Sequence, residues 1–187
     1  MGKLLRRVRR TPERLLHPLR RRNAIEALRA RPRPQTMLVV CHGNICRSPF
    51  AAALLARELA AHDMTVQSAG FAGFNRPAPP AAIAAAQRHG LDLGDHRSRL
   101  VTADLVRSAD LIVVMEATQQ RSICERFGRR PADVLILGDL DPAAVETRTI
   151  YDPVNDGVEV FEQVYDRIAR CVRELVAILT PAGVPTS

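Results

Sequence analysis

A cysteine and an arginine with five residues between them form the part of this sequence best suited to catalysis. Residues 41–49 read CHGNICRSP, so Cys41 and Arg47 mark the two ends of a short loop. A cysteine thiolate is a strong nucleophile, and the planar guanidinium group of arginine can hold two phosphoryl oxygens and the extra charge of the transition state. The pair predicts transfer of a phosphoryl group to the sulfur of Cys41.

The residues around this loop indicate a strand before it and a helix after it. Residues 37–40 are apolar, and Ser48 with the proline after it is typical of a helix start. Ligands of a parallel sheet bind where a strand ends and a helix N-terminus points back at them. Gly43 and Asn44 tolerate the positive φ that turns successive N–H groups inward. The helix dipole, these amides and the arginine should favour the thiolate of Cys41. A purely structural cysteine at a strand end is the alternative, which these flanking signals disfavour.

From residue 36 onward, short apolar runs alternate with helical patterns, which predicts an α/β fold with a four-stranded parallel sheet flanked by helices. The phosphate-binding loop would join the first strand to the first helix of this sheet. The last helix carries an apolar face that should close one side of the sheet. The expected strands are 37–40, 65–68, 111–115 and 134–137, and the expected helices are 49–61, 80–89, 118–127 and 158–179.

Composition and cysteine spacing restrict the function further. A chain of 187 residues with 47% hydrophobic residues suits one globular domain, and it has no apolar run of the ~20 residues that span a bilayer. Without a recognisable secretion signal, a cytoplasmic location is expected. The four cysteines lack the paired spacing of zinc sites and are too few for a disulfide framework. We therefore expect free thiols, no metal and no cofactor.

Positive charge is concentrated in the first 35 residues, which we interpret as a basic N-terminal extension. Twelve Lys and Arg face only Glu13 and Glu26 there, a net charge of +10, whereas 15 basic and 18 acidic residues leave −3 for the rest. Because the remainder is mildly acidic and aromatic residues are only 4%, no nucleic-acid partner is expected. Residues 36–182 would form the domain and 183–187 a tail.

Two interpretations of the extension remain open at this point. It is either a basic amphipathic arm, helical in part, that contacts an anionic surface or polymer, or a solvated or disordered tail, or even an over-extended start with Met37 as the true first residue. Thr11 and the proline after it predict a helix start, and Pro18 predicts an interruption of that helix.

Residues 40–49, read as VCHGNICRSP, resemble the signature of the low-molecular-weight protein tyrosine phosphatases, here of bacterial type with a basic extension. The resemblance covers about residues 36–180, and the signature combined with a late Asp-Pro is highly specific. Further matching segments are Ser68-Ala69-Gly70, His96-Arg97-Ser98-Arg99, Ala109-Asp110-Leu111-Ile112 with Met115, Leu137-Gly138-Asp139 and Tyr151-Asp152-Pro153.

The resemblance implies a two-step reaction through a cysteinyl-phosphate that water then hydrolyses. Cys41 would be the nucleophile, Arg47 the phosphate clamp and Asp152 the general acid and base. A second Asp-Pro begins at Asp141, but the Asp152 pair has the family's place just before the last helix. Asp141 is therefore expected to be a loop or cap residue.

The resemblance also implies which residues support the loop. Ser48 would donate its hydroxyl to the Cys41 sulfur, and Asn44, Ser48, Ser68 and His96 would hold the loop in shape. Without the resemblance, His96 would be interpreted as an ordinary exposed histidine.

Cys46 has two possible roles. As in many family members, it would form a reversible disulfide with Cys41 that protects the nucleophile from over-oxidation, or it fills apolar space beneath the loop. Cys124 and Cys171 are expected in the core.

Several positions depart from the family pattern and bear on substrate preference. Val154 and Asn155 replace two tyrosines that often wall the cleft, while Phe74 keeps an aromatic residue opposite them. Ile45 resembles the tyrosine-directed members, because relatives that favour phosphoarginine tend to have threonine there. His42 stands where an aliphatic residue is common, either as a rim contact or as a spectator. The phosphate-binding set is thus His42, Gly43, Asn44, Ile45, Cys46 and Ser48, with Phe74 at the rim.

The predicted function is metal-independent hydrolysis of phosphomonoesters, with a phosphotyrosine protein or a small phosphomonoester as substrate and a monomer or weak dimer as the working form. One alternative is a thiol-linked arsenate reductase on the same fold, although Cys124 has no close partner for a relay. The other is a catalytically weak anion-binding regulatory protein, against which the intact Cys41, Arg47 and Asp152 argue.

Overall fold

The protein contains a central sheet of four parallel strands, as the apolar runs predict. The computed structural model describes residues 2–181, with side chains from residue 13 onward. The strands are β1 (Thr36–Cys41), β2 (Thr65–Gly70), β3 (Leu111–Val114) and β4 (Val134–Ile136), in the order β2-β1-β3-β4. β1 pairs with a neighbour on each side, so the loop that begins at Cys41 follows a central strand of the sheet.

Helices cover both faces of the sheet, and the alternation of side chains along β1 shows why. Met37 and Val39 pack with the helices on one face, whereas Leu38 and Val40 pack with those on the other. α2 (Arg47–Glu58), α3 (Pro80–Gln87) and α6 (Val158–Leu179) lie on the first face, and α4 (Ala103–Ser108) and α5 (Ala117–Phe127) lie on the second.

The expected helices are confirmed to within a few residues at their ends, and α6 closes one side of the sheet as expected. α4 was not expected, because six residues are too few for a periodic pattern. Its start carries a cap, in which the Leu105 N–H donates to Thr102 Oγ1 at 3.3 Å. Three short 3-10 helices, η1 (Ala60–His62), η2 (Pro131–Asp133) and η3 (Leu137–Leu140), complete the regular structure.

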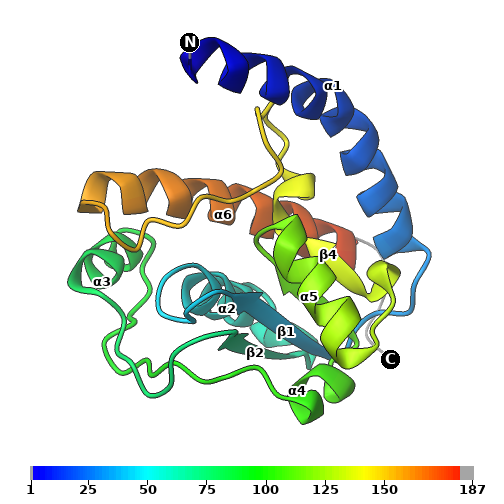
Figure 1. Ribbon diagram of the computed structural model, residues 1–187. Helices are drawn as coiled ribbons and strands as arrows, with labels where there is room; N and C mark the ends of the chain where they lie inside the picture. Colours follow the sequence, from blue (N-terminus) through cyan, green and yellow to red (C-terminus); the bar gives the residue numbers. More distant parts are fainter. Residues whose placement is uncertain (1, 182–187) are drawn as a thin grey trace.

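The N-terminal extension forms a long helix, α1 (Gly2–Arg29), that curves along the outside of the domain (Figure 1). It begins at Gly2 rather than Thr11 and continues through Pro18, so both expectations were wrong. A proline inside a helix costs about 3 kcal/mol. Packing of the second half of α1 against η3 and α6 offsets that cost: Leu28 is buried, Ile25 is partly buried, and Arg21 pairs with Glu174.

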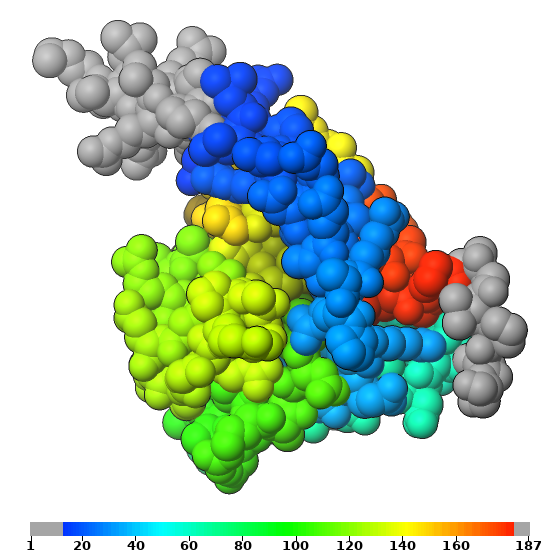
Figure 2. Space-filling model, turned by 90° about the vertical axis from the view of Figure 1, so that its right-hand side faces the viewer, coloured from blue at the N-terminus to red at the C-terminus, as the bar shows by residue number. Residues whose placement is uncertain are grey.

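The space-filling view shows how far α1 is integrated with the domain. In Figure 2, the part of α1 from residue 13 onward (blue) lies across the body between the yellow-green segment around β4 and the orange and red α6. The tail expected at 183–187 lies outside the described residues. Within the described part of the chain, no helix is long and apolar enough to cross a membrane.

Candidate active site

The loop between β1 and α2 places two hydrogen-bond donors against the sulfur of Cys41. The Asn44 N–H lies 3.3 Å from Cys41 Sγ, and the Ser48 hydroxyl lies 3.0 Å from it. Cys41 is buried at the end of β1, so the sulfur meets protein donors rather than bulk water. Donors directed at a cysteine sulfur stabilise negative charge on it. The structure thus brings Cys41, Asn44 and Ser48 together.

Asn44 is the centre of the loop's internal hydrogen bonding. It is fully buried, and its side-chain amide donates to the hydroxyls of Ser48 and Ser68, each at 3.0 Å. Its side-chain oxygen accepts the Arg99 N–H at 3.0 Å. Because these partners come from α2, β2 and the segment after α3, one side chain connects three parts of the fold to the loop.

The backbone turns at Asn44 alone, with φ of 50°. Of the two residues that tolerate a positive φ, Asn44 adopts it and Gly43 does not. An asparagine tolerates this left-handed conformation better than most residues, and its side-chain bonds hold it there.

His96 supports the same residue from the opposite side. Its Nε2 lies 2.7 Å from the Asn44 carbonyl oxygen. Burial is the main cause that lowers the pKa of His96, and the nearby Arg97 and Arg99 lower it further, while the bond to Asn44 acts in the opposite direction. Because a carbonyl oxygen can only accept, His96 Nε2–H is the donor, and this half-buried, hydrogen-bonded ring is not an ordinary exposed histidine.

Gly70 allows the loop to lie against the end of β2. A Cβ atom at this position would come within 2.7 Å of both the Asn44 nitrogen and the His42 oxygen. These are backbone atoms that cannot turn aside. Gly70 belongs to the segment Ser68-Ala69-Gly70 that resembles the phosphatase family, but the sequence did not indicate that the loop backbone comes this close to it.

Arg47 joins the loop to the segment that carries Asp152. The Arg47 side chain is only 2% exposed, and its Nη1 donates to the Ile150 carbonyl oxygen at 3.0 Å. The same guanidinium forms an ion pair with Asp152, which lies 105 residues later in the chain. Glu116, which sequence reasoning did not single out, lies 4.0 Å from Arg47 Nη1. The candidate cation and acid are therefore paired, and the candidate nucleophile lies at the other end of the same loop.

Asp141 holds the segment that leads to Asp152. It follows η3 and accepts the Ala143 N–H at 3.1 Å, as a loop or cap residue would. Its side chain is also fully buried against Arg167 of α6, with Arg167 Nε 3.0 Å from Asp141 Oδ2. Arg167 in turn donates to the Thr147 and Thr149 carbonyl oxygens, at 2.6 and 2.8 Å. This buried pairing was not anticipated.

Cys46 lies under the loop in the hydrophobic core. Burial above all raises the pKa of its thiol to about 12, and the charges of Asp152 and Cys41 act in the same direction. The Tyr165 hydroxyl donates to the Cys46 carbonyl oxygen at 3.1 Å, and the Tyr165 ring stacks on Phe50 with centroids 3.9 Å apart. These contacts form a rigid apolar floor for the loop.

The other two cysteines lie on opposite faces of the sheet. Cys171, in α6, packs on one face, whereas Cys124, in α5, packs on the other, so the two are not placed to form a relay pair. All four cysteines are free thiols. Among residues 2–181, no group of His, Cys, Asp and Glu is arranged to hold a metal ion.

Two segments that contact the loop carry exposed aromatic side chains. Phe74 is 73% exposed, in a segment tied to the loop by the Ala72 N–H, which donates to the His42 oxygen at 3.0 Å. Tyr151 is 58% exposed and directly precedes Asp152, and Val154 and Asn155 are also exposed. A hydrogen bond with Asp156 raises the pKa of the Tyr151 hydroxyl. His42 is exposed beside the loop, while Ile45 is buried within it.

Comparison with known proteins gives a consistent result. A family model described as low molecular weight phosphotyrosine protein phosphatase matches residues 36–182. The probable low molecular weight protein-tyrosine-phosphatase EpsP of Ralstonia nicotianae is 39% identical over 150 residues, covering 80% of this chain and 99% of EpsP. Wzb of Escherichia coli (strain K12), named a low molecular weight protein-tyrosine-phosphatase, is 36% identical over 139 residues, covering 74% and 90%.

Solved structures agree with these relatives. The tyrosine phosphatase Wzb from Escherichia coli K30, in complex with sulphate, has a TM-score of 0.70 and 31% identity, covering 78% of this chain and 99% of Wzb. The YwlE arginine phosphatase from Geobacillus stearothermophilus has a TM-score of 0.68 and 28% identity, covering 76% and 90%.

Proposed function

We propose a reaction for this chain, which belongs to the low molecular weight phosphotyrosine protein phosphatase family and is an enzyme of that class. It hydrolyses phosphate monoesters through Cys41, Arg47 and Asp152. The observation that carries the proposal is that one loop holds both Cys41, with two donors at its sulfur, and Arg47, which pairs with Asp152. No step of the proposed reaction needs a metal ion.

In the first step, Cys41 Sγ attacks the phosphorus atom and the bond from phosphorus to the ester oxygen breaks. Asp152, in its protonated form, gives its proton to the departing oxygen. Arg47 and the loop N–H groups hold the non-bridging oxygens as charge develops on them. The product is cysteinyl-phosphate plus an alcohol or phenol.

In the second step, water attacks the phosphorus atom and the phosphorus–sulfur bond breaks. The Asp152 carboxylate removes a proton from the attacking water, and inorganic phosphate leaves. The Ser48 hydroxyl, at 3.0 Å from the sulfur, stabilises the thiolate as it departs. The enzyme returns to its starting protonation state.

Phosphotyrosine in proteins is the proposed substrate. Phe74 and Tyr151 provide exposed aromatic faces near the loop, and they suit a phenyl ring even though valine and asparagine follow the Asp152 proline. Ile45, which is buried in the loop, stands where phosphoarginine-directed relatives tend to have threonine, and this residue type favours phosphotyrosine. Comparing kcat/KM for a phosphotyrosine peptide and a phosphoarginine peptide of the same sequence tests this choice, and Ile45→Thr should narrow the difference.

Hydrolysis of p-nitrophenyl phosphate and phenyl phosphate, in reductant and chelator from pH 5 to 8, tests the chemistry. Cys41→Ser should abolish turnover, with Cys124→Ser as the matched control at a thiol far from the loop. Asp152→Ala should slow phenyl phosphate more than p-nitrophenyl phosphate, because p-nitrophenolate leaves without a proton. Equal slowing of both esters would contradict the acid role of Asp152. Turnover by Cys41→Ser would contradict the whole mechanism.

The proposal extends to the setting of the enzyme. Free thiols suit the reducing cytoplasm, and we expect a monomer or weak dimer there. The basic extension, with Leu15, Leu16 and Leu19 exposed on α1, suits contact with an anionic surface. Full-length protein should sediment with phosphatidylserine vesicles and not with phosphatidylcholine vesicles, and salt should weaken that binding. Equal sedimentation with both would exclude the electrostatic contact.

A further inference from the structure

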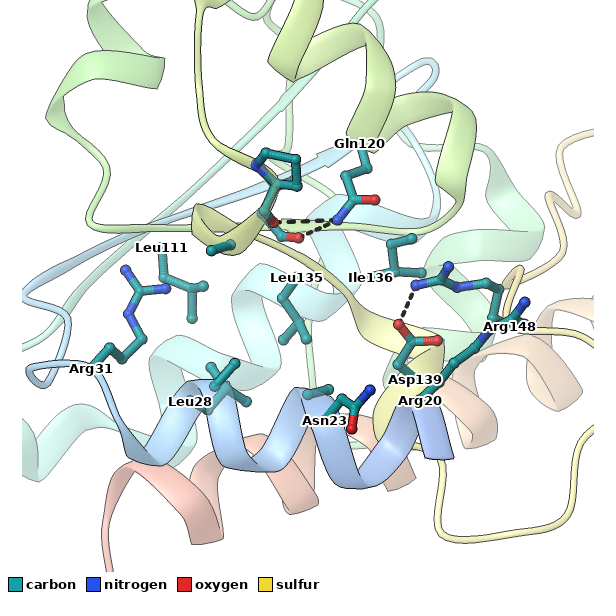
Figure 3. A pocket seen from close by; sticks show the side chains of 15 residues that line it. Arg20, Asn23, Leu28, Arg31, Leu111, Gln120, Leu135, Ile136, Asp139 and Arg148 are labelled. Atoms are coloured by element: carbon teal, nitrogen blue, oxygen red, sulfur yellow. Dashed lines mark hydrogen bonds and ion pairs between the residues drawn. The ribbon is translucent and has the colours of Figure 1, made fainter. Parts of the chain in front are cut away.

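A pocket of about 290 Å³ lies at the seam between α1 and the edge strand β4 (Figure 3). We refer to it as the seam pocket. Leu28 of α1 forms part of one wall, and Leu135 and Ile136 of β4 form the opposite wall. None of its lining residues belongs to the Cys41 loop. The pocket is therefore separate from the candidate active site, and binding of a ligand in it would not depend on the proposed phosphatase mechanism.

The charged side chains of the seam pocket are three arginines and one aspartate: Arg20, Arg31, Arg148 and Asp139. Figure 3 shows Arg20, Arg148 and Asp139 at one end, Arg31 at the other, and Leu28, Leu135 and Ile136 between them. Arg31 is engaged by the Asp110 carbonyl oxygen, and Arg148 by Asp139 Oδ2. Among the charged side chains that line the pocket, positive charge is thus in excess.

Several polar atoms at the Arg20 end are buried without a hydrogen-bond partner among the described residues. They are Nη1 of Arg20, Nε of Arg148 and Oδ1 of Asp139. Buried polar groups in proteins are nearly always paired, and an unpaired one costs roughly 1–3 kcal/mol. The two arginine donors match an anion, and the aspartate oxygen matches a hydroxyl group of the same ligand.

The middle of the pocket has a different chemistry. Leu28 and Leu135 present apolar surface, onto which a flat ring could pack. The volume lies near the lower end of the roughly 300–1,000 Å³ typical of small-molecule sites. A small ligand with an anionic end, hydroxyl groups and a flat apolar part fits all of these features.

We infer that the seam pocket binds a phosphorylated metabolite, of which a nucleoside monophosphate matches best. Its phosphate would lie between Arg20 and Arg148, a ribose hydroxyl would donate to Asp139 Oδ1, and the base would pack on Leu28 and Leu135. Residues 1–35 lie outside the region that the family model matches, so the α1 wall of this pocket is an addition to the family's domain.

Binding at this seam has a measurable consequence for α1. A ligand that contacts Arg20 and Leu28 on one side and Leu135 and Arg148 on the other stabilises the packing of α1 on the domain. Amide hydrogen exchange of residues 20–31 should therefore slow when AMP is added to the full-length protein.

The decisive experiment titrates AMP into the full-length Cys41→Ser variant, which cannot hydrolyse it, and measures heat. Adding Arg20→Gln should weaken AMP binding at the seam roughly 10–100-fold, the loss expected for a charged hydrogen bond. Arg22→Gln, a neighbouring exposed arginine that faces Glu26, should leave binding unchanged. Binding of AMP in the Cys41 loop would not distinguish the two substitutions. A difference in AMP affinity between Arg20→Gln and Arg22→Gln therefore reports on the seam pocket.

Ribose 5-phosphate and inorganic phosphate serve as comparison ligands, and AMP should bind more tightly than either. In the Cys41-intact protein, Arg20→Gln should hydrolyse p-nitrophenyl phosphate at the normal rate, which separates this inference from the proposed function. Equal AMP affinity in Arg20→Gln and Arg22→Gln would overturn the site. Equal affinity for AMP and ribose 5-phosphate would overturn the nucleoside assignment.

Discussion

Replacing Asn44 by alanine is expected to remove about 4 kcal/mol from the free energy of unfolding. The side chain makes three hydrogen bonds at 3.0 Å, each worth about 1 kcal/mol net. Alanine in the left-handed backbone at φ 50° adds a strain of about 1 kcal/mol. Against a total stability of roughly 5–15 kcal/mol, such a loss is readily measured by urea unfolding.

Asn75 provides a matched control for this experiment. It has nearly the same backbone, with φ of 55°, but it is exposed and its side chain makes no hydrogen bond among the described residues. Asn75→Ala should cost only about 1 kcal/mol, and Asn44→Gly, which keeps the backbone but loses the side chain, about 3 kcal/mol. If Asn44→Ala costs no more than Asn75→Ala, the side-chain bonds do not hold the loop and the reasoning fails.

Three further results are expected. Asp141→Asn should lower the free energy of unfolding by about 3 kcal/mol, because it leaves Arg167 without its buried charge partner. It should also lower kcat more than it raises KM, because the segment that carries Asp152 loosens. An unchanged kcat would refute the role of Asp141 in positioning that segment. His96 has a pKa below its usual 6.5 in the folded protein, so the unfolded chain binds a proton first and stability should decline as pH falls below about 6.5. His96→Gln should flatten that decline in urea titrations, and an unaltered slope would exclude His96 as its source. Cys46, whose pKa is raised to about 12, should resist alkylation by iodoacetamide at pH 8 in wild type and in Cys41→Ser. Peptide mass spectrometry measures this alkylation. Modification of Cys46 at the rate of a free thiol would contradict its burial.

The sheet, its helices and the loop after β1 could be predicted because their signals are contiguous in the chain. Four apolar runs separated by helical patterns require a parallel sheet with helices on its faces, and Cys41, Arg47 and the helix start after them lie within one stretch of residues. The wrong prediction for the first helix came from considering neighbouring residues alone. Pro18 was expected to break the first helix, because propensity alone does not include the packing of Leu28 and Ile25 on the domain.

The fold class and the family could be read from the chain alone, as could the loop that carries the candidate nucleophile Cys41, since each depends on patterns of neighbouring residues. Three features emerged only from the folded molecule: the pairing of Arg47 with Asp152 and Glu116, the burial of Asp141 against Arg167, and the pocket between α1 and β4. These features join residues far apart in the chain. Their geometry depends on how the helices pack on the sheet, and residue spacing carries no record of that packing.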